Sequence, residues 1–318
     1  MAALGDPRLP AKAANYRAAR TRSTHAPAPA LAASGVRPSK SKGQNFLVQG
    51  AVADRIVAAA ALKPDDEVVE IGPGLGILSE RIAACPVRRL CLVELDPRLA
   101  AALRERFHCA ADVEVVESDF LKLDLPARVM AGSRHRRGDA RPTKIKVIGN
   151  LPFNVAGAIL RKLCESRHLI SRMVLMFQRE VGERIRAHPG TEGYSALSVY
   201  SALYWEIEAH FRVAAGNFHP RPKVDAEVIV FAPRPAPFEP EEEGALLKVI
   251  RAAFSSRRKT VRNALKGALK VSPAEVERAL SDASIDPACR AETLAVADFV
   301  RLARALRAIL ASYLARAD

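Results

Sequence analysis

Asn150, Leu151 and Phe153 form a short group of residues that could bind the amine of a nucleobase. The side-chain oxygen of Asn150 can accept a hydrogen bond from an amino group. Pro152 has no N–H and favours an extended Leu151, so the Leu151 carbonyl could be left free as a second acceptor. The ring of Phe153 offers a surface on which a base can stack. The alternative interpretation is a strand followed by a proline turn with a core phenylalanine.

A glycine-rich turn and two acidic residues precede this group. Gly72, Gly74 and Gly76 follow an apolar strand and would let the backbone turn tightly and approach a ligand closely. Their G-x-G-x-G spacing differs from the dinucleotide-binding pattern, so no pyrophosphate is implied. Glu94 could accept both hydroxyls of a ribose, and Asp119 could accept from an adenine amino group. The alternatives are a solvated strand-end acid at Glu94 and a turn-forming aspartate at Asp119.

Alternating strands and helices from Ser41 to Pro235 predict a doubly wound α/β domain that would position these residues. Ligands of such open sheets bind outside the carboxyl ends of the strands, near the point where the strand order reverses. Glu94, Asp119 and Asn150 lie at successive strand ends, so one nucleoside-bearing ligand could reach toward all three. The expected strands are 67–71, 90–94, 113–116, 145–148 and 172–177. The expected helices are 51–62, 77–84, 97–106, 155–166 and 179–187.

The chain beyond these elements divides into a sheet extension and a second domain. Two later strands, near 206–213 and 225–231, are expected to pair as an antiparallel addition at the sheet edge. Prolines 233, 235 and 237 mark a linker. Helical apolar spacing then predicts a small all-helical domain at 240–318, after a first domain at 41–235.

The net charge, the apolar stretches and the cysteines of the chain indicate what kind of partner and compartment to expect. The chain has 318 residues and a net charge of +14, which favours a polyanionic partner such as nucleic acid. No stretch approaches the length of apolar sequence that spans a bilayer, so no membrane association is expected. The five cysteines include no CxxC pair, which indicates buried thiols in a reducing compartment and neither a disulfide framework nor a metal site.

Basic segments could supply contacts to RNA phosphates. Residues 1–40 are Arg-rich, with Asp6 as the only acid, and are expected to be disordered. A solvated tail, an RNA-binding arm and an organelle transit peptide all fit this composition. Residues 251–270 contain no acid, and their basic side chains could bind RNA or lie on a solvated helix face. The candidate RNA-binding residues there are Arg257, Arg258, Lys259 and Arg262.

Seven motifs in order resemble the S-adenosylmethionine-dependent ribosomal RNA adenine dimethyltransferases, the family of the kasugamycin-sensitivity enzyme. The resemblance covers about residues 40–310. The motifs are Lys42–Leu47, Glu70–Gly76, Val93–Asp96, Gly149–Asn154, Met176–Ile185, Asn217–Asp225 and Phe254–Thr260. It implies a Rossmann-like methyltransferase domain followed by a small all-helical domain, acting as a cytoplasmic monomer.

The resemblance also implies roles for single residues. Asn150 and Leu151 would hold the amine of the target adenine, Phe153 would stack on its ring, and Phe218 would cover its other face. The residues expected at S-adenosylmethionine are Asn45, Leu47, Gly72, Gly74, Gly76, Glu94, Asp119 and Asn150. The expected substrate is the pair of adjacent adenosines in the hairpin loop near the 3′ end of small-subunit ribosomal RNA.

The chain departs from the family pattern in a few places, and two other functions stay open. Phe153 stands where the family usually has Tyr, which preserves stacking but removes a phenolic hydroxyl. Arg128–Lys146 is a basic segment that looks inserted; it could add phosphate contacts or be a solvated loop. An erythromycin-resistance-type enzyme would methylate large-subunit RNA through a similar site. A nonenzymatic RNA-binding assembly factor or mitochondrial transcription factor would use the same fold without catalysis.

Overall fold

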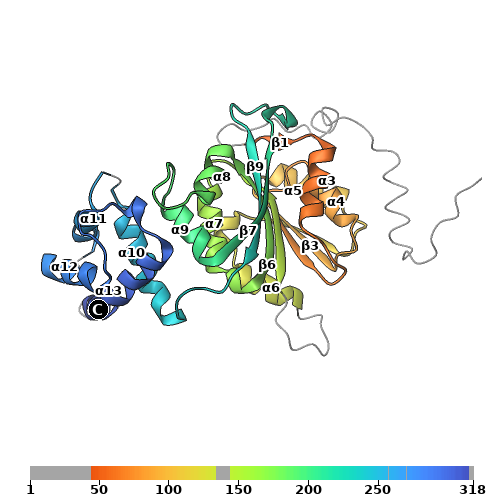
Figure 1. Cartoon of the computed structure of the whole chain (residues 1–318). Coiled ribbons are helices and arrows are strands. Elements are labelled where there is room, and N and C mark those ends of the chain that lie inside the picture. The colour runs from red at the N-terminus through yellow and green to blue at the C-terminus, as the bar shows by residue number, and fades with distance from the viewer. Residues whose placement is uncertain (1–43, 134–143, 257, 270, 315–318) are drawn as a thin grey trace, which may run out of the picture. The chain divides into compact units, whose positions relative to one another are not determined.

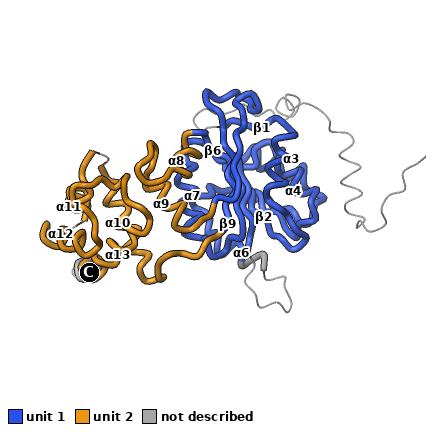
Figure 2. Tube along the Cα trace, in the orientation of Figure 1, with its two compact units in different colours: residues 1–179, 207–232 blue, residues 180–206, 233–318 orange. Residues whose placement is uncertain are grey.

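The computed structural model describes residues 44–133, 144–256, 258–269 and 271–314. The arm at 1–40, most of the basic segment 128–146 and Arg257 therefore lie outside the described residues. The chain divides into two compact units, coloured separately in Figure 2. Unit 1 comprises the chain up to Arg179 together with Ile207–Ala232, and unit 2 comprises Glu180–Glu206 together with Pro233–Asp318.

The division differs from the predicted domains at one place, because residues 180–206 group with the helical unit. Contacts within unit 2 explain this grouping. The Tyr194 hydroxyl donates to the Leu294 carbonyl at 2.9 Å, and the Tyr204 hydroxyl donates to Glu243 Oε1 at 2.7 Å. Both partners come from the last third of the sequence, so the local pattern around 180–206 could not reveal them.

A seven-stranded sheet forms the centre of unit 1, with strand order β4-β3-β2-β5-β6-β9-β7 (Figure 1). The pairs from β4 to β6 are all parallel, and β9 pairs antiparallel with β6. The late strands β9 and β7 thus extend the sheet at one edge, as expected. The bounds are β2 Glu67–Ile71, β3 Arg89–Glu94, β4 Val113–Glu117, β5 Ile145–Asn150, β6 Ile170–Gln178, β7 Trp205–Val213 and β9 Ala226–Pro233.

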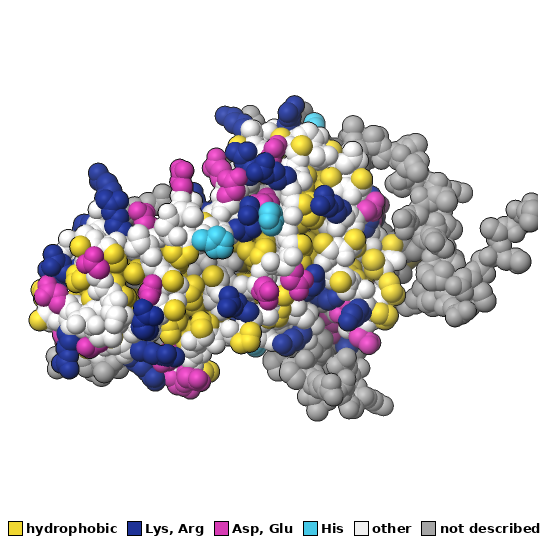
Figure 3. Space-filling view, viewed as in Figure 1, with side chains coloured by type: hydrophobic (Ala, Val, Ile, Leu, Met, Phe, Trp, Pro, Cys, Tyr) yellow, Lys and Arg dark blue, Asp and Glu magenta, His cyan; other side chains and the backbone are white. Residues whose placement is uncertain are grey.

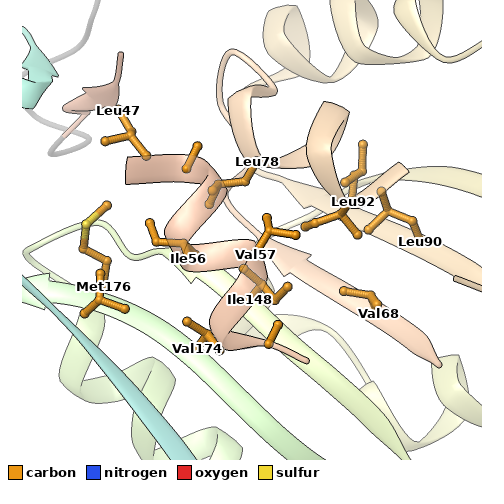
Figure 4. Close-up of a cluster of buried hydrophobic side chains, with 14 of the residues drawn as sticks. Leu47, Ile56, Val57, Val68, Leu78, Leu90, Leu92, Ile148, Val174 and Met176 are labelled. Atoms are coloured by element: carbon orange, nitrogen blue, oxygen red, sulfur yellow. The ribbon is translucent and has the colours of Figure 1, made fainter. Parts of the chain in front are cut away.

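Helices cover both faces of this sheet because its strands carry apolar side chains on both sides. Figure 1 shows α3, α4 and α5 on one face and α7 on the other. In Figure 4, Ile56 and Val57 of α3 lie among strand residues such as Val68, Ile148 and Val174, which belong to one buried cluster. The helix bounds in unit 1 are α3 Gly50–Ala59, α4 Ile77–Ala83, α5 Pro97–Arg106, α6 Leu125–Ser133 and α7 Ala156–Glu165.

A second, two-stranded sheet joins distant parts of unit 1. Strand β1 (Phe46–Leu47) pairs antiparallel with β8 (Phe218–His219), so that Leu47 lies opposite Phe218. The Val48 N–H extends this pairing by donating to the Asn217 carbonyl at 2.8 Å. This pairing fixes the backbone next to Asn45, a residue of the candidate site.

The helical part of unit 2 packs around fully buried aliphatic and aromatic residues. Leu246, Leu265 and Leu306 have no exposed surface, and the rings of Phe254 and Phe299 stack with centroids 5.7 Å apart. Ser272 begins α12 with a capping box to Glu275, as its sequence favours. The bounds are α8 Arg179–Arg186, α9 Ala196–Tyr204, α10 Glu243–Ala253, α11 Val261–Ala268, α12 Pro273–Asp282 and α13 Val296–Leu314. Across the described residues, no helix is both long and apolar enough to cross a membrane.

Candidate active site

A cavity lies at the carboxyl ends of the parallel strands in unit 1, where the strand order reverses between β2 and β5. It encloses about 1020 Å³ of empty space, part of which opens to solvent. Its lining comes from five segments: 44–47, 70–78, 93–99, 118–121 and 150–159. These are the strand ends that the sequence motifs predicted, together with the segment around β1.

The glycine turn after β2 forms one wall of the cavity. Gly72 and Gly74 line it with φ angles of 65° and 58°, values that side-chain-bearing residues rarely adopt. A Cβ on Gly74 would lie 2.9 Å from Cδ1 of the Phe46 ring, which is too close. Gly76 has φ 81° and begins α4, but it is not among the lining residues. Gly76 therefore shapes the helix start, whereas Gly72 and Gly74 open space for a ligand.

Glu94 ends β3 with its carboxylate fixed by two backbone donors. Oε2 accepts from the Gly74 N–H at 3.0 Å, and Oε1 accepts from the Asp96 N–H at 2.8 Å. Burial raises the pKa of Glu94, while these two hydrogen bonds oppose that rise. A carboxylate has about four lone-pair sites, so that of Glu94 can still accept from a ligand hydroxyl.

Glu70 is a buried acid in the cavity lining to which the sequence analysis gave no role. It is 1% exposed, and its Oε2 accepts from the Ser79 hydroxyl at 2.7 Å. Burial raises the pKa of Glu70 to about 8, and the nearby charge of Glu94 adds to the rise. Glu70 is therefore mostly neutral at pH 7. The available signal was an acid between two apolar strand residues, Val69 and Ile71, where a buried charged side chain needs a partner.

Asp119 lines the cavity after β4 and also caps a short 3₁₀ turn, η1 (Phe120–Lys122). Its Oδ1 accepts from the Leu121 N–H at 2.9 Å. The turn-forming role and the ligand-facing position are thus combined in one residue. The hydrogen bond holds the carboxyl group at the cavity, where its second oxygen can accept from a ligand.

Asn150 ends β5 with a side chain oriented by the segment before β1. Its Nδ2 donates to the Asn45 backbone carbonyl at 3.0 Å. This contact assigns the amide orientation and makes Oδ1 available as an acceptor. The Leu151 N–H donates to Met176 O at 3.1 Å, and no group in the described part of the chain donates to the Leu151 carbonyl. Two acceptors therefore lie on adjacent residues.

Phe153 lines the cavity with a partly exposed side chain, as stacking on a base requires. Phe218 does not line it. Its ring is 3% exposed and belongs to the core cluster that includes Leu47 and Ile56. In this structure Phe218 therefore has the position of a core aromatic, and its expected role as a cover for the target base stays a prediction. Asn45 and Leu47, for which contact with the cofactor is predicted, both line the cavity.

The candidate RNA-binding residues belong to unit 2. Arg258 and Lys259 are exposed before α11, and Arg262 forms an ion pair with Glu277 at 3.5 Å. On the face shown in Figure 3, Lys and Arg side chains are interspersed with Asp and Glu. Within the described ranges, no group of three or more His, Cys, Asp or Glu side chains is placed to hold a metal ion.

Comparison with known proteins identifies the family of this chain. The family model described as ribosomal RNA adenine dimethylase matches residues 36–308. The chain is 40% identical over 278 residues to ribosomal RNA small subunit methyltransferase A of Geobacter metallireducens, covering 86% of this chain and 98% of the relative. The corresponding protein of Syntrophotalea carbinolica is 42% identical over 273 residues, covering 85% and 97%.

Two solved structures share the fold. A dimethyladenosine transferase from Plasmodium falciparum has a TM-score of 0.65 at 22% identity, covering 83% of this chain and 98% of that chain. The 23S rRNA methyltransferase ErmE has a TM-score of 0.58 at 26% identity, covering 83% and 100%. With a family match over most of its length and relatives at about 40% identity, the chain belongs to the ribosomal RNA adenine dimethylase family.

Proposed function

We propose that this protein uses S-adenosylmethionine to dimethylate the N6 amines of two adjacent adenosines in the 3′-terminal hairpin loop of small-subunit ribosomal RNA. Support for the small subunit comes from the names of relatives that are 40% and 42% identical. The large-subunit enzyme ErmE is only 26% identical. The two relatives at 40% and 42% identity are bacterial proteins, which gives no support to mitochondrial import or a mitochondrial role.

The cavity residues fit the proposed cofactor. The positive φ angles at Gly72 and Gly74 favour glycine, which adds no Cβ to the wall, and a Cβ on Gly74 would collide with Phe46. Glu94 would accept from ribose hydroxyls and Asp119 from the adenine amine, with Asn45 and Leu47 closing the cavity from the β1 segment. When bound, the cofactor would supply a methyl group on a positively charged sulfur.

The observation that carries the proposal is the pair of acceptors on Asn150 and Leu151. Nδ2 of Asn150 donates to the Asn45 carbonyl, so Oδ1 is available as an acceptor. The Leu151 carbonyl accepts no hydrogen bond from the described residues. Together they can take both hydrogens of an adenine amine. Such bonding favours a pyramidal nitrogen whose lone pair is directed, and orientation of this kind supplies much of an enzyme's acceleration.

The other residues of the loop would complete the binding of the base. Phe153 would stack on the adenine ring, a contact worth about 1–3 kcal/mol. The reaction needs no general base in the loop, because the amine proton can leave to water after the methyl group is bonded. A base must leave its stack to reach such a cavity, which favours a loop adenosine over a paired one.

The test is transfer of labelled methyl groups from S-adenosylmethionine to unmethylated small ribosomal subunits, followed by mapping of the modified bases. We expect two adjacent dimethylated adenosines in the 3′-terminal hairpin. Asn150→Ala should abolish transfer while binding of the subunit is retained. Transfer to large-subunit RNA alone would identify the resistance-type activity instead. Tight RNA binding without any transfer would identify a nonenzymatic assembly factor.

A further inference from the structure

Lys162 of α7 reaches across to the η1 turn and is bound there by backbone carbonyls. Its half-buried side chain donates from Nζ to Leu121 O at 2.8 Å and to Leu123 O at 2.5 Å. The same ammonium lies 5.6 Å from the centroid of the Phe120 ring. A charged donor with two carbonyl acceptors forms stronger hydrogen bonds than a neutral donor would. Lys162 therefore binds the middle and the C-terminal end of one short turn.

This turn carries the adenine-binding side of the candidate cofactor site. Asp119, Phe120 and Leu121 all line the cavity. Leu121 connects the two interactions, because its N–H donates to Asp119 Oδ1 and its carbonyl accepts from Lys162. A shift of Leu121 would therefore move the carboxyl group of Asp119 relative to a bound ligand.

Helix α7 carries another side of the cavity and packs against η1. It begins directly after the loop that contains Leu151 and Phe153, and its Ile159 also lines the cavity. The strands that precede the two sides, β4 and β5, are separated in the sheet by β3 and β2. At about 4.8 Å per strand, the two strand ends lie roughly 14 Å apart. Lys162 provides a direct link between these sides that the sheet itself does not.

We propose that Lys162 is a positioning residue for the methyl transfer: it fixes the Asp119 turn against the helix that carries the target-base loop. The inference rests on the proposed function. Lys162 sets the affinity for the adenosine part of the cofactor. Through α7 it also sets the alignment between that cofactor and the amine held by Asn150 and Leu151.

The test compares Lys162→Met with Arg161→Met in the full-length protein. Met keeps the length of the side chain and removes the donor, while Arg161 is an exposed cation on the same helix and controls for lost charge. The probes are S-adenosylhomocysteine and 5′-methylthioadenosine, which lacks the amino-acid part. Loss of two charge-assisted hydrogen bonds at the turn should weaken the binding of both probes about ten-fold in Lys162→Met. Arg161→Met should stay within about two-fold of the unmodified protein.

Kinetics and hydrogen exchange separate positioning from general stability. In Lys162→Met, kcat should fall at saturating cofactor while KM for small subunits stays constant. Lys162→Arg should restore part of the lost kcat and part of the lost affinity for the two probes. Amide exchange should accelerate at Lys122 and Leu123 and remain unchanged in β5. Accelerated exchange throughout unit 1 would overturn the proposal, since Lys162 would then be a general structural residue.

Two binding outcomes would also overturn it. Unchanged affinity of Lys162→Met for 5′-methylthioadenosine would show that the turn is held without Lys162. An equal loss in Arg161→Met would show that charge alone matters. Failure of the proposed function is distinguishable, because it would appear in the unmodified protein. That protein would then bind neither probe, or would bind both probes without methylating small subunits.

Discussion

Replacement of Glu70 by Gln tests whether a neutral acid is buried beside the cofactor site. Gln has nearly the same shape, and its amide oxygen can still accept from the Ser79 hydroxyl, which donates to Glu70 at 2.7 Å. The change therefore removes the ionisable group while keeping the packing of a residue that is 1% exposed. Any difference that depends on pH then reports the titration of Glu70.

The magnitude follows from the pKa in the folded protein, which burial raises from 4.5 to about 8. Between these two values the unfolded chain has lost the Glu70 proton and the folded chain retains it. The folded state binds more protons there, so its free energy of unfolding falls as pH rises. A pKa shift of this size lowers the free energy of unfolding by a total on the order of 5 kcal/mol. The full loss is reached near pH 8, and no loss is present below about pH 4.5.

Urea denaturation followed by circular dichroism between pH 5 and pH 9 measures this effect. Glu70→Gln should gain free energy of unfolding relative to the unmodified protein as pH rises, by several kcal/mol at pH 8 and above. Glu105→Gln, which changes an exposed residue of α5, serves as the control and should show no such trend. A constant difference between Glu70→Gln and the unmodified protein across this range would refute the reasoning, because Glu70 would then be ionised in the folded state throughout.

Three further changes test other parts of the structure. Gly74→Ala places a Cβ 2.9 Å from the Phe46 ring at a φ of 58°. Calorimetry with S-adenosylhomocysteine should therefore show at least ten-fold weaker binding. Normal affinity would mean that the glycine turn is not a wall of the cofactor site. Phe153→Ala should lower methyl transfer about 10–100-fold, whereas Phe153→Tyr should retain it, and a tyrosine variant without turnover would exclude stacking as the role. Leu306→Ala, at a fully buried position of α13, should lower the free energy of unfolding of unit 2 by about 2–5 kcal/mol, as measured by hydrogen exchange. Cofactor affinity should stay unchanged. A loss below about 1 kcal/mol would contradict the packing described.

Local patterns predicted most of the sheet in unit 1. The strand expected at 67–71 has those bounds, and the one expected at 145–148 extends to Asn150. The periodicity of apolar residues, short apolar runs and glycine turns are properties of residues that are close in sequence. They can therefore be recognised without knowing any contact between distant residues. The same reasoning assigned residues 180–206 to the first domain. Their partners, such as Glu243 and Leu294, lie too far along the chain to enter a local pattern.

Two site residues show why the tertiary structure was needed to decide their roles. Phe218 belongs to a motif that implied contact with the target base, yet its pairing with Leu47 puts its ring in the core. Glu70 lies in a recognised motif, but its pKa rises to about 8 mainly because the folded chain buries it completely. Burial depends on what the rest of the chain places around a residue, and the sequence near that residue does not contain this information.

The sequence by itself determined the family, the α/β alternation and the strand ends that bear Glu94, Asp119 and Asn150, because these depend on residue type and short-range spacing. Only the tertiary structure decided the orientation of the Asn150 amide, which is set by a carbonyl 105 residues away, and the link from Lys162 to the Asp119 turn. Both are hydrogen bonds between groups that the fold brings together. Their geometry depends on the packing of several elements at once, which no local pattern specifies.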